Sequence, residues 1–117
     1  MTDYPFEAVD LERGAELLDE HGWIQRNEGG RTVGFCAYAA VREAVSERTQ
    51  VPRPFIGDEL AEFLGVKGVE VIAANGTGGI VFHSVDLAGF NDTPGRTKEE
   101  VIDLLMLGAK KLRDLGQ

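Results

Sequence analysis

Apolar residues recur at helical spacing in several segments of this chain, and the first of these covers residues 10–21. Asp10 can cap the start of that helix, and Gly22 fits the left-handed position that often follows a last turn. The apolar face of the segment consists of Leu11, Ala15 and Leu18. The pattern therefore predicts an amphipathic helix that packs through this face.

A second helix is predicted from about residue 35 to residue 48, and its first half has no polar face. We expect that half to be central and buried. Pro52 and Pro54 interrupt helical structure, and a short third helix follows them until Gly65 ends it. The apolar face of this third helix consists of Ile56, Leu60, Phe63 and Leu64.

Two β-branched runs, at residues 69–73 and 80–84, flank a glycine-rich segment. Strand, loop and strand is the natural interpretation, so we expect a short β-hairpin. The last helix is predicted over residues 98–115, after a turn at Pro94-Gly95. Thr97 and Glu100 stand at the spacing of a capping box at its start. Its apolar stripe consists of Val101, Leu105, Leu112 and Leu115.

Together these elements predict a helix-rich α+β fold, with about four helices packed around a buried second helix and one hairpin. The 117 residues suit a single domain, residues 1–117, and the 43% hydrophobic and 27% charged contents are those of an ordinary globular protein. No segment approaches the ~20 apolar residues that span a bilayer, and residues 1–4 are unlike a signal-peptide start. A single cysteine cannot form an internal disulfide, so we expect a cytoplasmic protein.

Three motifs carry a resemblance to a known family. Residues 90–101 contain Asn-Asp-x-Pro-Gly-Arg-Thr behind an aromatic residue, Gly22-Trp23 closes the first helix, and residues 34–40 open the second. In these motifs the chain resembles a family of short uncharacterised proteins from actinobacteria and their phages. Phe90 stands where that family usually has Trp, and Ala39 where it usually has Gly. The resemblance implies a helical fold, in which one arm of the hairpin could instead join a helix, and it implies no activity.

The net charge of −8 comes from 12 Lys and Arg against 20 Asp and Glu. That sign repels phosphate backbones and anionic lipids, so we expect neither direct nucleic-acid binding nor membrane binding. Acidic residues gather on the first and third predicted helices, where solvated helix faces are the ordinary explanation. The functional alternative is a surface that docks a basic protein partner or, less favoured, imitates nucleic acid. The residues predicted to bind the partner are Asp19, Glu20, Asp58 and Glu62.

Cys36 is the one side chain with the character of a nucleophile, and it falls at a predicted helix start, where the helix dipole can lower the pKa of a thiol. A cysteine enzyme also needs a base, and the candidates are His83 and His21. His83 with Asp86 close behind it gives a nucleophile–base–orienter order. Apolar residues flank Cys36 on both sides, however, and cysteine usually behaves as a small buried hydrophobe. We therefore expect no catalytic residue, with Cys36, His83 and Asp86 as the alternative.

The remaining polar candidates have structural explanations. His21 lies in the last turn of the first helix, where a positively charged imidazole is favoured by the dipole. Two histidines and one cysteine far apart show no metal-ligand spacing, and the acidic pairs lack an EF-hand pattern, so we expect no metal and no cofactor.

Residues 75–79, Asn-Gly-Thr-Gly-Gly, look superficially like a phosphate loop but lack the Lys-Ser/Thr that completes one. Asn-Gly is itself a hairpin signal, so a hairpin turn is favoured. The alternative is a small anion held by the backbone amides of Gly76 and Gly78. Arg96 can hold its turn by pairing with a carboxylate beside Asn91 and Asp92, or it can act as a recognition arginine on an exposed loop.

We therefore expect a small non-catalytic accessory or regulatory protein that binds a protein partner, in a phage–host setting if the resemblance is a guide. Two alternatives stay open. One is a small cysteine-dependent hydrolase or transferase that uses Cys36 with His83. The other is a binder of a small ligand, such as a signalling nucleotide, that uses the glycine-rich loop and Arg96.

Overall fold

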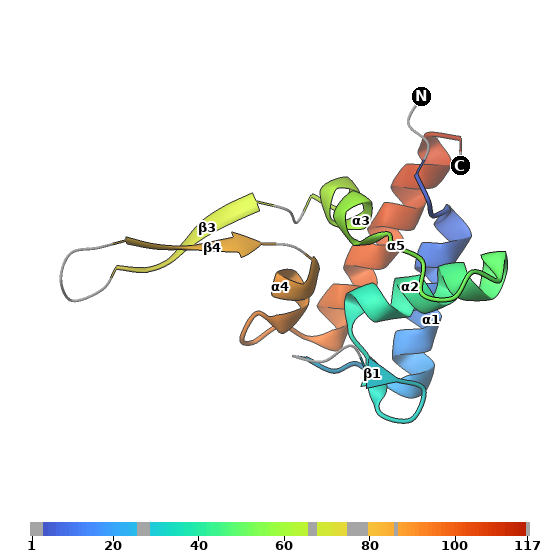
Figure 1. The fold of residues 1–117 in the computed structure, drawn as a ribbon, viewed down its shortest axis with the longest axis horizontal. Coiled ribbons are helices and arrows are strands. Elements are labelled where there is room, and N and C mark those ends of the chain that lie inside the picture. The colour runs from blue at the N-terminus through green and yellow to red at the C-terminus, as the bar shows by residue number, and fades with distance from the viewer. Residues whose placement is uncertain (1–3, 26–28, 66–67, 75–79, 86, 117) are drawn as a thin grey trace.

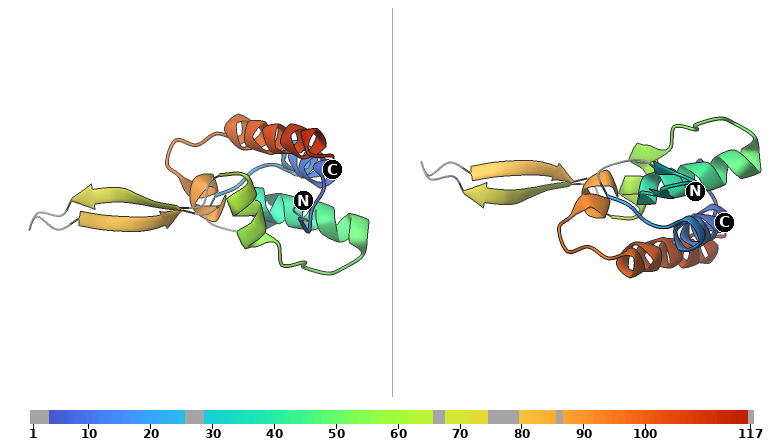
Figure 2. Two further views of the ribbon diagram at one scale, coloured as in Figure 1. Left: turned by 90° about the horizontal axis from the view of Figure 1, so that it is seen from above. Right: turned by 90° about the horizontal axis from the view of Figure 1, so that it is seen from below.

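The helical body contains three long helices that lie side by side (Figures 1 and 2). They are α1 (Ala8–His21), α2 (Ala37–Thr49) and α5 (Lys98–Asp114). α1 packs against both α2 and α5, so it is the middle helix of the three. The computed structural model describes residues 4–25, 29–65, 68–74, 80–85 and 87–116.

Two short helices and four strands complete the described part of the chain. The helices are α3 (Gly57–Phe63) and α4 (Leu87–Asp92), and both lie beside the long helices (Figure 1). The strands form two antiparallel pairs, β1 (Gly29–Gly30) with β2 (Gly34–Phe35) and β3 (Gly68–Ala74) with β4 (Ile80–Val85). The helix-rich α+β fold class is therefore confirmed.

The count of helices among the described residues differs from the prediction, because α4 occupies a segment for which the sequence analysis predicts no helix. α4 has six residues and Leu87 at its start is buried. A helix this short shows too few positions for helical periodicity to be recognised in a sequence. The turn itself is present just after it, where Gly95 has a φ of 83°.

The first half of α2 is buried, as predicted, and small residues let the helices approach closely. Ala37, Ala39, Ala40 and Val41 are all buried. On α1, Gly14 faces Val41, and a Cβ added to this glycine would lie 3.1 Å from Val41 Cγ2. A larger residue at position 14 would therefore push α1 and α2 apart.

The N-terminal cap of α1 is not Asp10, so that prediction is wrong. The helix begins one turn earlier, with Glu7 as its N-cap, and Asp10 Oδ2 accepts a hydrogen bond from Glu7 N at 2.8 Å. Asp10 thus holds the third helical position of a capping box, where an acidic residue also satisfies a free amide. Gly22 has the expected positive φ of 97°, but its ψ of 164° is extended rather than left-handed helical.

The predicted hairpin is confirmed by the pairing of β3 with β4, and it extends away from the helical body (Figures 1 and 2). Val69 pairs with Ser84 and Val71 with Phe82, and the register shifts between Val71 and Ala73. The glycine-rich loop at residues 75–79 lies outside the described residues.

The capping box predicted for α5 is present. Thr97 Oγ1 accepts a hydrogen bond from Glu100 N at 3.2 Å, and Thr97 N donates one to Glu100 Oε1 at 3.0 Å. We expect Thr97→Ala to lower the free energy of unfolding by about 1 kcal/mol, measured by urea denaturation. Thr32→Ala, at an exposed position outside the helices, should change it by less than about 0.5 kcal/mol. Equal denaturation midpoints for the two variants would contradict a capping role for Thr97.

Candidate functional site

A groove of about 780 Å³ lies between α1 and α5. Its apolar lining residues are Val9, Ala15, Ile102 and Met106, and its charged lining residues are Glu12, Arg13, Glu16 and Asp19. Val9 is 49% exposed and Met106 is 45% exposed. A smaller hollow of about 430 Å³ also contains Val9 and continues along the start of α1 to Arg113 and Gly116.

The groove arises because each helix carries apolar residues beside its buried stripe. On α5 the buried stripe includes Leu105 and Ala109, while Ile102 and Met106 follow each other at i, i+4 at the edge of that stripe. On α1, Val9 lies next to buried Ala8. The apolar face of the helix pair is therefore wider than the contact between the helices, and the excess faces the groove.

Two ion pairs join α1 to α5 along the groove. Glu12 pairs with Arg113 through two hydrogen bonds, and Asp19 lies 3.5 Å from Lys98 Nζ. These pairs connect the start of one helix to the end of the other, so α1 and α5 are antiparallel. The hydrogen bonds from Arg113 hold the pKa of the Glu12 carboxyl below its ordinary value.

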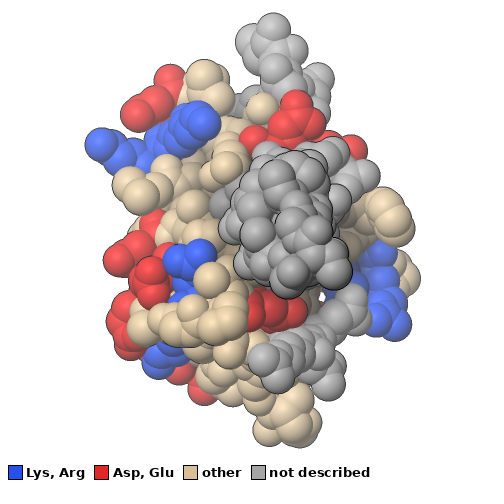
Figure 3. Space-filling view, turned by 90° about the vertical axis from the view of Figure 1, so that its left-hand side faces the viewer, with Lys and Arg blue, Asp and Glu red and all other residues tan. Residues whose placement is uncertain are grey.

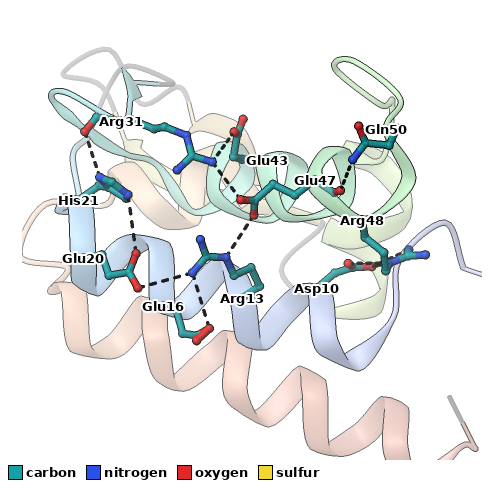
Figure 4. Close-up of polar contacts among 10 residues, drawn as sticks. All are labelled: Asp10, Arg13, Glu16, Glu20, His21, Arg31, Glu43, Glu47, Arg48 and Gln50. Carbon is teal, nitrogen blue, oxygen red and sulfur yellow. Dashed lines mark hydrogen bonds and ion pairs between the residues drawn. The ribbon is translucent and has the colours of Figure 1, made fainter.

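Two of the four predicted partner-binding residues take part in ion pairs within the chain. Asp19 pairs with Lys98, as above, and Glu20 lies 3.5 Å from Arg13 and 3.8 Å from His21 (Figure 4). Asp19 also lines the groove. The structure therefore places Asp19 in the lining of the groove and Glu20 beside it, paired with the groove-lining residue Arg13.

The other two predicted partner-binding residues are on α3. Glu62 is exposed and has no ion pair among the residues that the structure describes. The side chain of Asp58 lies outside the described part. On the face drawn in Figure 3, acidic and basic side chains lie next to one another in several places. Some of the acidic side chains, including those of Asp19 and Glu20, are thus paired with a basic side chain of the same chain.

A four-residue network joins α1, α2 and the segment before β2 (Figure 4). Glu47 accepts hydrogen bonds from Arg13 Nε at 3.2 Å and Arg31 Nη2 at 3.0 Å, and Arg31 also reaches Glu43 at 3.0 Å. Partial burial raises the pKa of Glu47, but the two arginines outweigh that effect and leave this pKa below its ordinary value. His21 lies in the last turn of α1, with its Nδ1 at 3.1 Å from the carbonyl oxygen of Arg31. These contacts hold the helical body together.

Cys36 is 7% exposed and caps the start of α2, where its Sγ accepts a hydrogen bond from Ala39 N at 3.4 Å. The predicted burial at a helix start is therefore confirmed. The other two residues of the catalytic alternative are not brought to it by any described contact. His83 is a residue of β4 whose side chain lies outside the described part, and Asp86 lies outside it altogether.

The thiol of Cys36 should react slowly in the folded protein, because burial limits access to it. Since the chain has a single cysteine, a titration with a thiol reagent reports this residue alone. We expect labelling to be at least about tenfold faster in urea than in the native state. Native labelling as fast as that of the unfolded chain would contradict this and favour the nucleophile.

Arg96 holds the turn before α5, and the predicted pair between its guanidinium and a carboxylate is present. Its Nε donates a hydrogen bond to the carbonyl oxygen of Phe90 at 3.0 Å, and its guanidinium carbon lies 3.7 Å from the centre of the Phe90 ring. It also pairs with the carboxylate of Glu100, at 3.1 Å. Glu100 is one helical turn further along the chain, a spacing at which side chains of a helix meet. Gly76 and Gly78, the other residues of the ligand-binding alternative, lie outside the described residues.

Sequence reasoning missed a fully buried polar residue with several hydrogen bonds, Asn91, which is 0% exposed. Its Oδ1 accepts hydrogen bonds from Trp23 Nε1 at 2.6 Å and Ala37 N at 2.8 Å. Its Nδ2 donates to the carbonyl oxygen of Ile24 and to Asp92 Oδ1, both at 3.0 Å. Asn91 therefore joins the end of α4 to the start of α2 and to the segment after α1. The one available signal was its place in the Asn-Asp-x-Pro-Gly-Arg-Thr motif.

Within the described ranges, no group of three or more His, Cys, Asp or Glu residues is placed to hold a metal ion. None of the helices described is both long enough and apolar enough to cross a membrane.

Comparison with known proteins gives one finding. Searches of curated proteins and of solved structures return no match. A family model does match, over residues 7–111, which include all five helices except the last residues of α5. The chain therefore belongs to DUF6197, a family of unknown function.

Proposed function

We propose that this chain is a small non-catalytic accessory or regulatory protein that binds a protein partner through the groove between α1 and α5. The exposure of Val9 and Met106 carries the proposal, because these half-exposed side chains lie in one groove with charged residues around them. An apolar centre with a polar margin is the usual composition of a protein-binding surface. An occupant would remove both side chains from water.

Two further observations favour binding over chemistry. The thiol of Cys36 is buried and already accepts a hydrogen bond from the first turn of α2. The guanidinium of Arg96 is already held by Phe90 and Glu100. Both groups therefore have structural roles, which is the ordinary outcome for a small buried cysteine and a turn arginine.

We also propose a cellular environment for this protein. The resemblance to proteins of actinobacteria and their phages supports a phage–host setting. The single cysteine suits the reducing cytoplasm, where thiols do not need disulfide partners. We therefore place the partner among cytoplasmic proteins of such a cell.

The test compares two double variants of the tagged full chain in pull-downs from an actinobacterial lysate, with quantitative mass spectrometry. Val9→Gln/Met106→Gln makes the groove polar without adding charge. Val51→Gln/Leu107→Gln makes the same change at positions that are similarly exposed and do not line the groove. We expect at least one partner to be lost, by about tenfold or more, with the groove variant and retained with the control variant.

Equal capture by both variants would contradict the proposal, and so would a wild-type chain that captures nothing above a tag-only control. Thermal melting of each variant should accompany the pull-down. Substitutions at exposed positions normally change stability by less than about 0.5 kcal/mol, so loss of capture should not come from unfolding.

A further inference from the structure

Each carboxylate that lines the groove has a cationic partner in the described part of the chain: Glu12 pairs with Arg113, Asp19 with Lys98, and Glu16 with Arg13. The contact of Glu16 is the longest of the three: its side chain is 59% exposed, and Arg13, which is 3.8 Å away, also hydrogen-bonds Glu47. In Figure 4 Arg13 extends from α1 toward α2, whereas Glu16 lies on the other side of it. Glu16 is therefore available to a positively charged occupant of the groove.

Two more carboxylates lie beside the groove on α5, although they are not among its lining residues. Glu99 and Asp103 are exposed, and neither has an ion pair among the described residues. Each stands three residues before a groove-lining residue, Ile102 and Met106 respectively, so each lies on the same side of α5 as that residue. Glu99 and Asp103 also repel each other, since like charges at i, i+4 are unfavourable. A cation between them would relieve that repulsion.

We propose that the occupant of the groove is an amphipathic helix with basic residues along its polar margin. The inference rests on the proposed function and adds the chemistry of the partner. The apolar face of such a helix would cover Val9, Ile102 and Met106, and its Lys or Arg side chains would meet Glu16, Glu99 and Asp103. A helix that lays its apolar face into a groove is a recurring mode of peptide recognition.

The dimensions of the groove fit this occupant. It follows α1 from Asp19 to Val9 and continues in the smaller hollow to Glu7. Thirteen residues of a helix span about 20 Å, so the groove can take about three turns of a partner helix. Packing against two antiparallel helices at once also gives the partner the same surroundings as a core helix of a bundle.

Charge argues against two other occupants. A second copy of this chain carries the same net charge of −8, so its approach is opposed by long-range repulsion. A nucleic acid would bring phosphates toward Glu16, Glu99 and Asp103, which is unfavourable for the same reason. A basic helix is instead attracted over the distance of the Debye length, about 8 Å at physiological salt.

The test uses the full chain with the photoreactive residue p-benzoylphenylalanine at one position, either Met106 in the groove or Leu107 outside it. After irradiation in an actinobacterial lysate, the cross-linked peptides are sequenced by mass spectrometry. We expect cross-links from position 106 and not from position 107. The captured peptide should be rich in Lys and Arg, with apolar residues at i, i+3, i+4 and i+7.

A pair of triple variants tests the charge argument. Glu16→Gln/Glu99→Gln/Asp103→Asn removes one groove-lining carboxylate and the two beside the groove on α5, and should lower the cross-link yield at position 106 at least fivefold. Glu59→Gln/Glu62→Gln/Asp114→Asn removes the same charge from exposed positions that do not line the groove, and should change the yield less than twofold.

Three outcomes would overturn the inference. They are equal yields for the two triple variants, a captured peptide that is acidic or lacks helical periodicity, and a cross-link to a second copy of this chain. None of these outcomes conflicts with groove-dependent capture of a partner in the pull-down. The proposed function could therefore be correct although the inference about the chemistry of the partner is wrong. If the wild-type groove cross-links to nothing and captures nothing, both are wrong.

Discussion

Asn91→Ala is expected to lower the free energy of unfolding by about 3 kcal/mol. The Oδ1 of this fully buried side chain accepts hydrogen bonds from Trp23 Nε1 at 2.6 Å and from Ala37 N at 2.8 Å. Alanine offers neither donor a partner, and each buried donor left unpaired costs about 1–3 kcal/mol. The carbonyl oxygen of Ile24 loses its donor as well. The measurement is urea denaturation followed by far-ultraviolet circular dichroism.

Trp23→Phe is the matched control, because it removes one of these donors and leaves Asn91 in place. Asn91 Oδ1 then keeps its hydrogen bond from Ala37 N, so we expect a loss of only about 1 kcal/mol. If Asn91→Ala costs no more than Trp23→Phe, then water replaces the lost partners and Asn91 does not hold these segments together.

The long elements could be predicted from the sequence because each is long enough for its hydrophobic pattern, helical or alternating, to repeat several times. α1, α2, α5 and the β3–β4 hairpin are examples, and their ends were located to within a few residues. The exact ends of helices are harder to predict, because the same residue type can accept a hydrogen bond from a free backbone amide at more than one position of the first turn. Asp10 could cap a helix either as its N-cap residue or from the third helical position, and the structure has the second arrangement.

Other features could not be predicted because they depend on residues outside the local segment. Leu115 was placed on the apolar stripe of the last helix, yet it is exposed because α5 ends at Asp114. Asn91 shows no pattern at all, since its partners Trp23 and Ala37 are more than fifty residues away in the sequence. Contacts at that separation depend on how the helices assemble, and no local rule predicts them.

The groove could not be predicted for the same reason. Ile102 and Met106 are ordinary apolar residues of an amphipathic helix, and only the position of α1 leaves them facing a groove. The acidic clusters were recognised in the sequence, but their pairing was not. The structure separates Asp19 and Glu20, which have cationic neighbours, from Glu99 and Asp103, for which the described residues provide none. That distinction decides which carboxylates can serve a partner.

The second large effect is expected at the ion pair between α1 and α2. Asp10 is 1% exposed, and Arg48 donates to it through Nε at 2.9 Å and Nη2 at 2.8 Å. We expect Arg48→Met to lower the free energy of unfolding by about 2 kcal/mol in urea denaturation. Breaking a fully buried pair costs about 3–5 kcal/mol, and the effect here is smaller because the Arg48 side chain is 35% exposed.

A second substitution distinguishes two causes of the lost stability, namely the unpaired charge of Asp10 and the lost packing of the Arg48 side chain. Arg48→Met leaves the Asp10 carboxylate buried without its cation, whereas Asp10→Asn/Arg48→Met removes the charge and keeps an oxygen that can accept from Glu7 N. The double variant should therefore recover at least about 1 kcal/mol relative to Arg48→Met alone, because an uncompensated buried charge costs more than a buried amide. Arg113→Met, which breaks the exposed pair with Glu12, should change the denaturation midpoint much less than Arg48→Met does. If the double variant is no more stable than Arg48→Met alone, the loss comes from the packing of the Arg48 side chain, and Asp10 tolerates burial without its partner.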